Sequence, residues 1–391
     1  MKKRKIFKKV LLAISSVVLG LVVLVSSVVG VTVNKGYQDA FQEDYYLKFE
    51  DPREQLIALA LLAPSSHNIQ PWLIKLSEEE KNEMTLYINT DRILSAVDGD
   101  FTQMVFSSGV FLEYMNEGAK IIGVDLEISY FPEGELSMNP TLEEVEQTPI
   151  ALISYQAEDL SPSMKIDACT GATERLSYDE GVDSSLIEEM ITFNKDESST
   201  LSFVTEDENL TKLRNLLIEG VEVESKNEAA MLETANIYRF TNYQKNKYGY
   251  GLSMESDHPN QFMLTLMEFL GITLKQSWEQ DGVMWLARDT KTINSSKTFG
   301  LIQTRFNTRL DQIKSGIMYG KIQLFAYSNG LEMQPLYQTL EKYDEISNLN
   351  DLVHEEFAQE NNTIQMIFRM GVNSEDVSQG MRLHVEDITK K

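Results

Sequence analysis

The sequence predicts a mixed α+β fold: two fused half-domains built around antiparallel or mixed sheets, preceded by one transmembrane helix. Three observations lead to this prediction. A run of 24 residues without any charge, residues 10–33, follows six basic residues at the N-terminus. Segments with helical and with strand periodicity alternate through the rest of the chain. A polar stretch that contains Pro and Glu, residues 133–148, separates a first set of these segments from a longer second set.

The uncharged run is predicted to be an uncleaved membrane anchor. At ~1.5 Å rise per residue, a helix over this run is about 36 Å long, enough to cross a hydrocarbon core of about 30 Å. A cleavable signal peptide is the alternative, although its apolar core normally runs about 7–15 residues and no clean small-residue cleavage site ends this run. Basic residues in 1–9 favour a cytoplasmic N-terminus. We therefore expect a single-pass cell-membrane protein with a linker at 34–50 and its main domain outside the cytoplasm.

The rest of the chain is strongly acidic. The full sequence has a formal net charge of -25, and without the six N-terminal cations 29 basic residues face 60 acidic ones. Such a surface repels phosphate backbones and anionic lipid, which disfavours nucleic-acid binding. One cysteine, Cys169, and four scattered histidines exclude an internal disulfide and predict no metal site. The fold must therefore depend on its hydrophobic core.

The individual elements follow from local patterns. Asp51 is expected to cap a helix that has Pro52 at its first position. Strands are predicted at 72–76, 84–89 and 124–130, with a helix at 101–122. Beyond residues 133–148, strands at 149–155, 201–204, 282–287 and 363–370 alternate with helices at 184–193, 207–235 and 305–328. We place the first half-domain at 51–155 and the second at 156–391.

A turn at residues 63–72, APSSHNIQPW, is the first candidate site. Pro64 ends the preceding helix, Pro71 fixes the entry to a strand led by Trp72, and polar side chains crowd the residues between them. An ordinary helix-to-strand turn can have the same composition. The full string, however, resembles the Pro-Ser-(Ser)-x-Asn-x-Gln-Pro-Trp turn of the nitroreductase family, which lies against the flavin ring.

Three later segments extend this resemblance in the same order. Residues 316–338, GIMYGKIQLFAYSNGLEMQPLYQ, resemble the family's long helix and its Gly-Leu-x-x-x-Pro-Leu segment. Residues 364–371, IQMIFRMG, resemble its last core strand, and residues 381–388, MRLHVEDI, its C-terminal arginine segment. Together the matches cover most of residues 50–390. They are most similar to the fused, Acg-like branch, in which one chain holds two nitroreductase-like halves.

The resemblance implies that FMN is held between the two halves. Guanidinium groups and hydroxyl donors suit a dianionic phosphate, although a single arginine in so acidic a chain is equally explained by a surface ion pair. By resemblance the isoalloxazine and ribityl groups are contacted by Ser65, Ser66, Asn68 and Gln70, the phosphate by Thr173, Arg175 and Arg382, and the N5 edge by backbone at Tyr337 and Gln338.

The sequence departs from the family in its phosphate segment. Aligning Thr173 and Arg175 places Gly171 where the family has its first phosphate-binding arginine, and the missing guanidinium costs about 1.5–3 kcal/mol of charge-assisted hydrogen bonding. Residues 167–173, DACTGAT, instead resemble the D-x-x-(S/T)-G-A-T signature that extracytoplasmic FMN transferases modify, with FAD as the donor. In that signature the last threonine carries FMN through a phosphoester bond.

This second resemblance implies a covalent FMN at Thr173 and an FMN transferase as the modifying partner. Asp167 and Thr170 would shape the turn, and Gly171 and Ala172 would let another enzyme approach the backbone. Non-covalent FMN, or a simple turn with a helix N-cap and no flavin, are the alternatives.

The sequence thus suggests an anchored, extracytoplasmic, FMN-dependent oxidoreductase that transfers electrons or hydride between an unknown donor and an unknown acceptor. It needs no obligatory catalytic acid or base from the protein. The Tyr-, Gly- and Asn-rich segment 239–253 is either a lid over the flavin or an exposed loop. The alternative function is non-catalytic: a flavin-binding or storage protein, or a scaffold with a degenerate nitroreductase fold.

Overall fold

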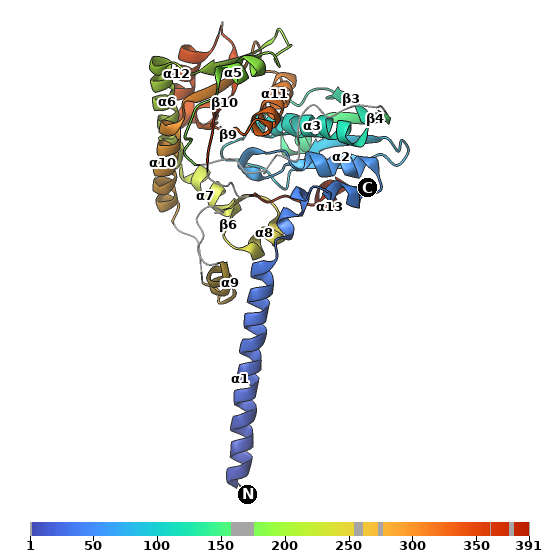
Figure 1. The fold of residues 1–391 in the computed structure, drawn as a ribbon, viewed down its shortest axis with the longest axis vertical. Helices are drawn as coiled ribbons and strands as arrows, with labels where there is room; N and C mark the ends of the chain where they lie inside the picture. Colours follow the sequence, from blue (N-terminus) through green and yellow to red (C-terminus); the bar gives the residue numbers. More distant parts are fainter. Residues whose placement is uncertain are drawn as a thin grey trace.

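The computed structural model describes residues 2–157, 176–253, 261–272, 277–359, 361–374 and 379–390. It confirms the predicted mixed α+β class. Figure 1 shows two lobes that stand above one long N-terminal helix, with helix α11 between them. The helices are α1 Lys2–Val33, α2 Pro52–Ala60, α3 Thr102–Ile122, α4 Leu142–Gln147, α5 Ser184–Ile191, α6 Asp207–Ser225, α7 Glu228–Ile237, α8 Asn242–Tyr248, α9 Gln261–Phe269, α10 Trp278–Ser295, α11 Arg309–Ser328, α12 Ser347–Phe357 and α13 Val385–Ile388.

Helix α1 is long and apolar enough to cross a membrane, judged by length and composition. A signal sequence near the N-terminus would have the same properties, so both alternatives stay open. The end of α1 is bound to the domain by helix α8. The side chain of Asn242 donates from Nδ2 to the Thr32 carbonyl at 2.6 Å, and that of Asn246 donates to the Asn34 carbonyl at 2.8 Å. These bonds satisfy carbonyls that a helix end leaves without intrahelical partners.

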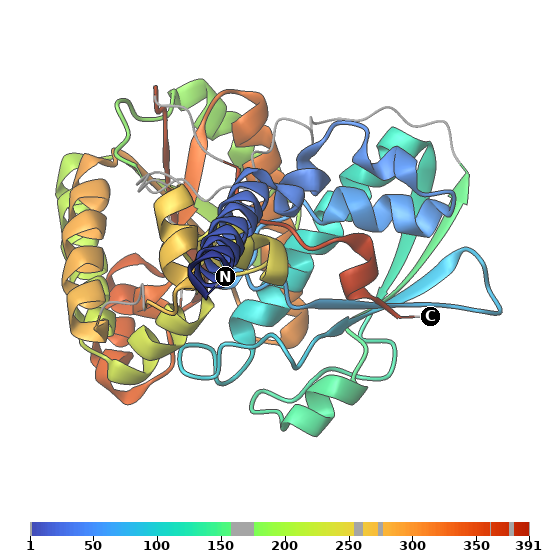
Figure 2. The same cartoon turned by 90° about the horizontal axis from the view of Figure 1, so that it is seen from below.

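The first lobe is built on a five-stranded sheet. Its strands are β1 Trp72–Leu76, β2 Glu83–Ile88, β3 Val124–Tyr130, β4 Ala151–Ala157 and β11 Thr389–Lys390, in the order β11-β1-β2-β4-β3. All neighbours are antiparallel except β11, which pairs parallel with β1 through Ile74 and Thr389. The last residues of the chain therefore return to the first lobe. Seen from below in Figure 2, this C-terminal segment, in red, lies beside β1 at the edge of the sheet.

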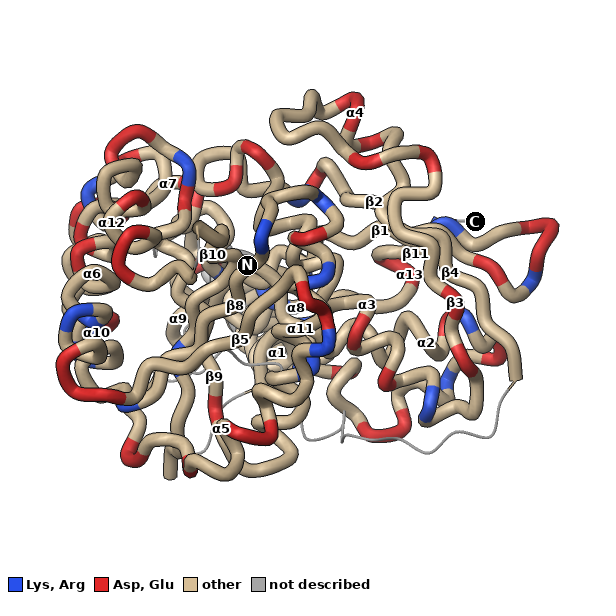
Figure 3. The backbone as a smooth tube through the Cα atoms, turned by 90° about the horizontal axis from the view of Figure 1, so that it is seen from above, with Lys and Arg blue, Asp and Glu red and all other residues tan. Residues whose placement is uncertain are grey.

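The second lobe is built on a four-stranded antiparallel sheet. Its strands are β5 Ser199–Val204, β8 Thr298–Thr304, β9 Glu332–Pro335 and β10 Thr363–Gly371, in the order β5-β8-β10-β9. Every residue of β8 is buried. Two short strands, β6 Tyr238–Arg239 and β7 Leu252–Ser253, form a separate parallel pair. In the view from above in Figure 3, acidic residues, coloured red along the backbone, are spread over both lobes, as the composition suggests.

Helices α3 and α11 hold the two lobes together. They make the most extensive contact between helices in the structure. The contact is close because glycines meet at the crossing: a Cβ added at Gly109 would lie 2.1 Å from the Ile313 carbonyl oxygen, and one at Gly316 would lie 2.0 Å from that of Phe106. The backbones can approach to this distance only without side chains at these two positions.

Two of the predicted elements are wrong. The apolar residues 282–287 were expected as a strand, but they lie inside helix α10, whose N-cap Ser277 accepts a hydrogen bond from the Gln280 amide. The single helix expected at 207–235 is two helices, α6 and α7. They separate at Asn227, whose side chain caps α7 by accepting from the Ala230 amide at 3.1 Å. A side chain that caps a new helix offers the backbone an alternative to continuing the old one.

A buried acid on α3 should make the stability of the domain depend on pH. Glu113 is 7% exposed, and burial, with the nearby charge of Glu117, raises its pKa to about 7 from 4.5. The folded state therefore binds the proton more tightly than the unfolded chain does. The resulting stabilisation is complete below pH 4.5 and is lost as the pH rises through about 7, a difference of about 3 kcal/mol.

We expect Glu113→Gln to increase the free energy of unfolding at pH 8 by up to this amount and to change it little at pH 4.5, as measured by urea denaturation. The exposed Glu127→Gln serves as the control and should change the stability by less than about 0.5 kcal/mol at either pH. If Glu113→Gln changes the free energy of unfolding equally at both pH values, protonation of Glu113 does not contribute to the pH dependence of stability.

Candidate functional site

The turn between α2 and β1 has an unusual backbone. Three of its residues have positive φ angles: His67 at 46°, Asn68 at 52° and Gln70 at 49°. Left-handed backbone is uncommon outside glycine, although Asn and His adopt it more readily than most residues. Ser65 supports the turn by accepting the Gln70 amide at 2.9 Å on its Oγ. Such strain persists only where surrounding contacts hold it, and it often accompanies a functional site.

The turn is fixed against the start of α3. Ser66 donates twice: its Oγ donates to Gln103 Oε1 at 2.6 Å, and its backbone amide donates to Ser107 Oγ at 3.2 Å. Trp72, the first residue of β1, donates from Nε1 to the Ser107 carbonyl and stacks 4.5 Å from the Phe111 ring. The geometry of the turn is thus determined by α3, the helix that also carries the contact with the second lobe.

Two distant segments meet at this turn. Asn68 accepts from the Gly251 amide at 2.9 Å, and its Nδ2 donates to the carbonyls of Gly251 and Met381, each at 3.1 Å. Gln70, fully buried, donates to the Gly249 carbonyl and accepts from the Leu383 amide, both at 2.9 Å. The 65–72 turn, the 248–251 segment and the C-terminal 381–383 segment therefore form one hydrogen-bonded unit.

The structure brings five of the predicted site residues together in this unit: Ser65, Ser66, Asn68, Gln70 and Arg382. Arg382 is 1% exposed. Its Nη1 donates to Asn68 Oδ1 at 2.8 Å and to the Met381 carbonyl at 2.7 Å, and its Nη2 donates to the Leu62 carbonyl at 3.1 Å. Arg382 lies beside the turn, where the resemblance expects it. These N–H groups donate to acceptors within the protein itself. The cofactor contacts of all five residues stay predictions.

Tyr337 and Gln338 lie elsewhere, after β9 and at the start of the short 3-10 helix Gln338–Leu340. No hydrogen bond joins either residue to the 65–72 turn in the described part of the chain. Burial, and then the charges of Asp98 and Asp100, raise the pKa of the Tyr337 hydroxyl. Asp98 also accepts the Gln103 amide at 2.8 Å, and Gln103 in turn accepts from Ser66.

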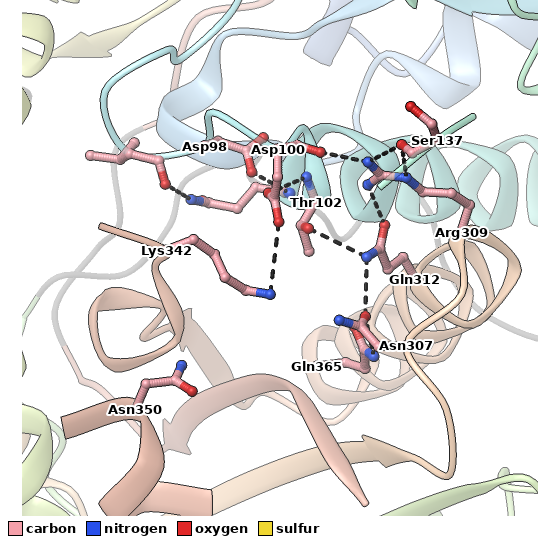
Figure 4. Close-up of polar contacts among 12 residues, drawn as sticks. Asp98, Asp100, Thr102, Ser137, Asn307, Arg309, Gln312, Lys342, Asn350 and Gln365 are labelled. Atoms are coloured by element: carbon pink, nitrogen blue, oxygen red, sulfur yellow. Dashed lines mark hydrogen bonds and ion pairs between the residues drawn. The ribbon is translucent and has the colours of Figure 1, made fainter. Parts of the chain in front are cut away.

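A buried arginine links the lobes beside this first turn of α3 (Figure 4). Arg309, at the start of α11, is 1% exposed and donates to the carbonyls of Asp100 at 2.6 Å and Ser137 at 2.7 Å. Its Nη1 donates to Gln312 Oε1 at 2.8 Å, and Gln312 donates in turn to Thr102 Oγ1 at 3.3 Å. Through these hydrogen bonds the Arg309 guanidinium connects the start of α11 to residues of the first lobe.

A cavity of about 390 Å³ opens next to this network. Asp100 and Lys342 lie on its wall, with 3.7 Å between the Asp100 Oδ2 and the Lys342 Nζ. Four of its eight lining residues are polar or charged, whereas sites for large aromatic ligands are lined mainly by apolar side chains. It suits a small polar molecule better than a flavin ring. The lining residues are Ser95, Ala96, Val97, Gly99, Asp100, Met138, Asn139 and Lys342.

Sequence analysis missed two arginines beside the turn. Arg92 donates to the carbonyls of Gln70 and Trp72, each at 3.0 Å. Arg239 is 6% exposed, donates to the Tyr250 carbonyl at 3.2 Å, and lies 5.2 Å from the Tyr250 ring, which Arg92 approaches to 5.9 Å. Neither forms an ion pair with a carboxylate of the described residues. Burial lowers the pKa of both guanidiniums.

These arginines place positive charge next to the strained turn of a very acidic protein. Arg239 belongs to the 239–253 segment that composition had singled out, whereas nothing in the local sequence around Arg92 indicated a role. The segment is not an exposed loop: it forms β6, α8 and β7, and Gly249 and Gly251 hydrogen-bond the turn. A Cβ at Gly251 would lie 2.1 Å from the Ile237 carbonyl oxygen, so the close approach requires glycine.

The remaining predicted site residues lie outside the described residues. They are the flavin-attachment motif of Asp167, Thr170, Gly171, Ala172 and Thr173, together with Arg175. Their roles stay predictions from the sequence. Among the residues that the structure describes, no group of His, Cys, Asp and Glu side chains could hold a metal ion.

Comparison with known proteins finds only distant similarity, and only among solved structures. No family model matches the chain, and no curated protein matches it. Among solved structures, the FMN-dependent nitroreductase NfnB from Mycobacterium smegmatis in complex with NADPH is similar at 13% identity over 52% of this chain and 84% of its own, with a TM-score of 0.30.

Two further structures are similar to the chain. A nitroreductase with bound FMN from Desulfitobacterium hafniense has 12% identity over 54% of this chain and 90% of its own, with a TM-score of 0.28. A protein of Anabaena variabilis assigned to the nitroreductases has 8% identity over 84% of this chain and 90% of its own, with a TM-score of 0.34. Likeness at this level transfers neither residues nor chemistry, so the proposal below rests on the motifs and on the geometry of the turn.

Proposed function

We propose that this protein is a membrane-anchored, extracytoplasmic FMN-binding oxidoreductase of the nitroreductase type. The observation that carries the proposal is the hydrogen-bonded unit at the 65–72 turn. Residues predicted from two motifs more than 300 positions apart, Asn68 and Arg382, are joined there at 2.8 Å. A chance resemblance in each motif would not bring the two together.

The residues of this unit fit a planar, anionic cofactor. The strained backbone at Asn68 and Gln70 presents peptide groups in an arrangement that an ordinary turn does not need. Arg92 and Arg239 supply positive charge close to that backbone, and the Tyr250 ring lies against both guanidiniums. In this proposal the half-buried Ser65 and Asn68 contact the cofactor, the fully buried Gln70 holds the turn in place, and the arginines favour the negative charge of the cofactor. FMN, when bound, supplies one- or two-electron chemistry.

The proposal extends to a covalent tether at Thr173, on the basis of the DACTGAT motif. An FMN transferase would join the Thr173 hydroxyl oxygen to the FMN phosphorus of FAD, with AMP as the leaving group and the hydroxyl proton released. Outside the cytoplasm a lost cofactor cannot be replaced from a flavin pool, so the tether would make up for the guanidinium missing at Gly171. The alternative function, a flavin-storage or scaffold protein, would bind flavin without redox turnover.

The test is the intact mass of the denatured full chain, produced with and without an FMN transferase. We expect a mass increase of one FMN less water only with the transferase, and none in Thr173→Ala. Thr170→Ser, which keeps the motif, is the matched control and should still be modified. A yellow native protein with unchanged denatured mass would disprove the tether and leave a non-covalent site, and a colourless protein would disprove flavin binding.

Turnover separates the oxidoreductase from the storage alternative. Flavin-loaded protein should cycle repeatedly when mixed with an artificial one-electron donor and an acceptor, followed by flavin absorbance. A protein that holds flavin but does not cycle would support the non-catalytic alternative.

A further inference from the structure

Helix α9 has the reverse of the usual surface pattern. Its polar side chains bind the protein: Gln261 Oε1 accepts from the Asn242 amide at 3.0 Å, and Glu268 accepts from Thr241 Oγ1 at 2.6 Å and Gln244 Nε2 at 3.0 Å. None of its apolar side chains is buried: four are half-buried, and Met263 and Phe269 are exposed. Met263 is 50% exposed, Phe269 43%, and Leu270 and Ile272, just beyond the helix, 60% and 46%. A surface helix in water normally turns its apolar stripe to the core.

Helix α9 also lies beside the outer part of α1. The two helices are in contact, and Figure 1 shows α9 alongside the upper part of α1, below the lobes. In Figure 2, seen from below, the two helices lie next to each other. Val28 of α1 is fully buried there, whereas Val25 and Val29 are 46% and 45% exposed. Val28 is five residues before the end of the uncharged run, or about 7.5 Å along the helix. If α1 spans a membrane, α9 lies at the depth of that membrane's outer interface.

The charge around α9 is compatible with lipid, unlike that of the protein as a whole. Helix α8, which binds α9, has no acidic residue; its Lys247 is exposed, whereas its Lys245 is buried, and Lys35 is exposed just beyond α1. The one acid on α9, Glu268, is bound to α8. Tyr243 is 37% exposed, and its ring lies 5.9 Å from that of Phe269, which places two aromatic side chains where membrane interfaces favour them.

From these three observations we infer that the exposed face of α9, formed by Met263, Phe269, Leu270 and Ile272, inserts into the outer interface of the bilayer that α1 spans. The inference rests on the anchor in the proposed function. Helices of this kind bury their apolar face about 5–10 Å into the headgroup and acyl boundary. Because α8 joins α9 to the 248–251 segment, this second membrane contact holds the candidate site at a fixed height close to the membrane surface.

The test uses the full chain in vesicles of phosphatidylcholine and phosphatidylglycerol, with Cys169→Ser as the background. A single cysteine at Met263, Leu270 or Val25 carries an environment-sensitive fluorophore, and nitroxide-labelled lipids quench it at shallow or deep positions. Val283→Cys on α10, at a side chain 70% exposed, is the matched control. We expect shallow nitroxides to quench the probes at Met263 and Leu270 at least two-fold more than the probe at Val283.

The probe at Val25 separates this inference from the anchor. Quenching at Val25, with Met263 and Leu270 quenched no more than Val283, would overturn the inference and assign the apolar face to a protein partner. No quenching at Val25 would overturn the anchor itself, and with it the inference that depends on it.

Discussion

Replacing Arg382 with methionine should destabilise the flavin-free protein by about 3 kcal/mol or more. The guanidinium is 1% exposed and donates to Asn68 Oδ1 and to the carbonyls of Leu62 and Met381. Methionine fills part of the volume but donates nothing. The Met381 carbonyl keeps Asn68 Nδ2 as a donor, but Asn68 Oδ1 and the Leu62 carbonyl lose the guanidinium, at a cost of about 1–3 kcal/mol each. The change also removes a guanidinium that lies 5.2 Å from the Phe41 ring. Urea denaturation of the flavin-free full chain in detergent measures the loss.

This experiment distinguishes two roles for Arg382. The resemblance implies a phosphate ligand, and such a residue would affect stability only when flavin is bound. The structure shows an arginine that joins the C-terminal segment to the turn, and this role predicts the loss without any flavin. Lys226→Met is the control, since Lys226 pairs with Glu222, the two side chains are 69% and 47% exposed, and exposed pairs contribute about 0–1 kcal/mol. Equal stability of the two variants would contradict the joining role.

The contrast also shows what the sequence could and could not predict at the candidate site. The motifs identified Asn68, Gln70 and Arg382 as a group because short strings of polar residues around prolines are distinctive. They did not reveal that Arg382 points at the Leu62 carbonyl, because a motif gives the residue type and not the direction of its donors. Arg92 was missed for the same reason: its partners, Gln70 and Trp72, are 20 or more positions away.

Prediction of the elements failed where periodicity was short or absent. Residues 282–287, GVMWLA, are a brief apolar run that fits a strand or a helix equally well. In the structure Leu286 packs on the second core, while Val283 and Met284 of the same helix are exposed. Strand β8, TFGLIQT, was not predicted, because it is buried on both faces and contains Gly300. That glycine is required: a Cβ there would lie 2.1 Å from the Phe368 ring.

The largest loss of stability should come from Gly316→Ala, and Gly316→Val should prevent cooperative folding. The added Cβ would meet the Phe106 carbonyl oxygen at 2.0 Å and the Gly109 Cα at 3.0 Å, and neither is the end of a flexible side chain. Helices α3 and α11 must therefore separate by about 1 Å or more, which removes packing along their whole contact. We expect a cost of about 3 kcal/mol or more for alanine, above the usual range for overpacking because backbone must move.

Gly320→Ala is the matched control on the same helix. There the Cβ would meet the Glu113 Cβ at 3.2 Å, a side-chain contact that a shift of a few tenths of an ångström relieves. Alanine also favours the helix by up to about 1 kcal/mol over glycine, so this variant should be close to neutral. If Gly316→Ala unfolds at the same urea concentration as Gly320→Ala, the helices do not cross as closely as the structure shows. Displacement of α3 from α11 should also affect the candidate site, because Gln103 on α3 binds Ser66 while Arg309 on α11 binds the Asp100 carbonyl. Under the proposed function, flavin binding should therefore weaken in Gly316→Ala even where the protein remains folded.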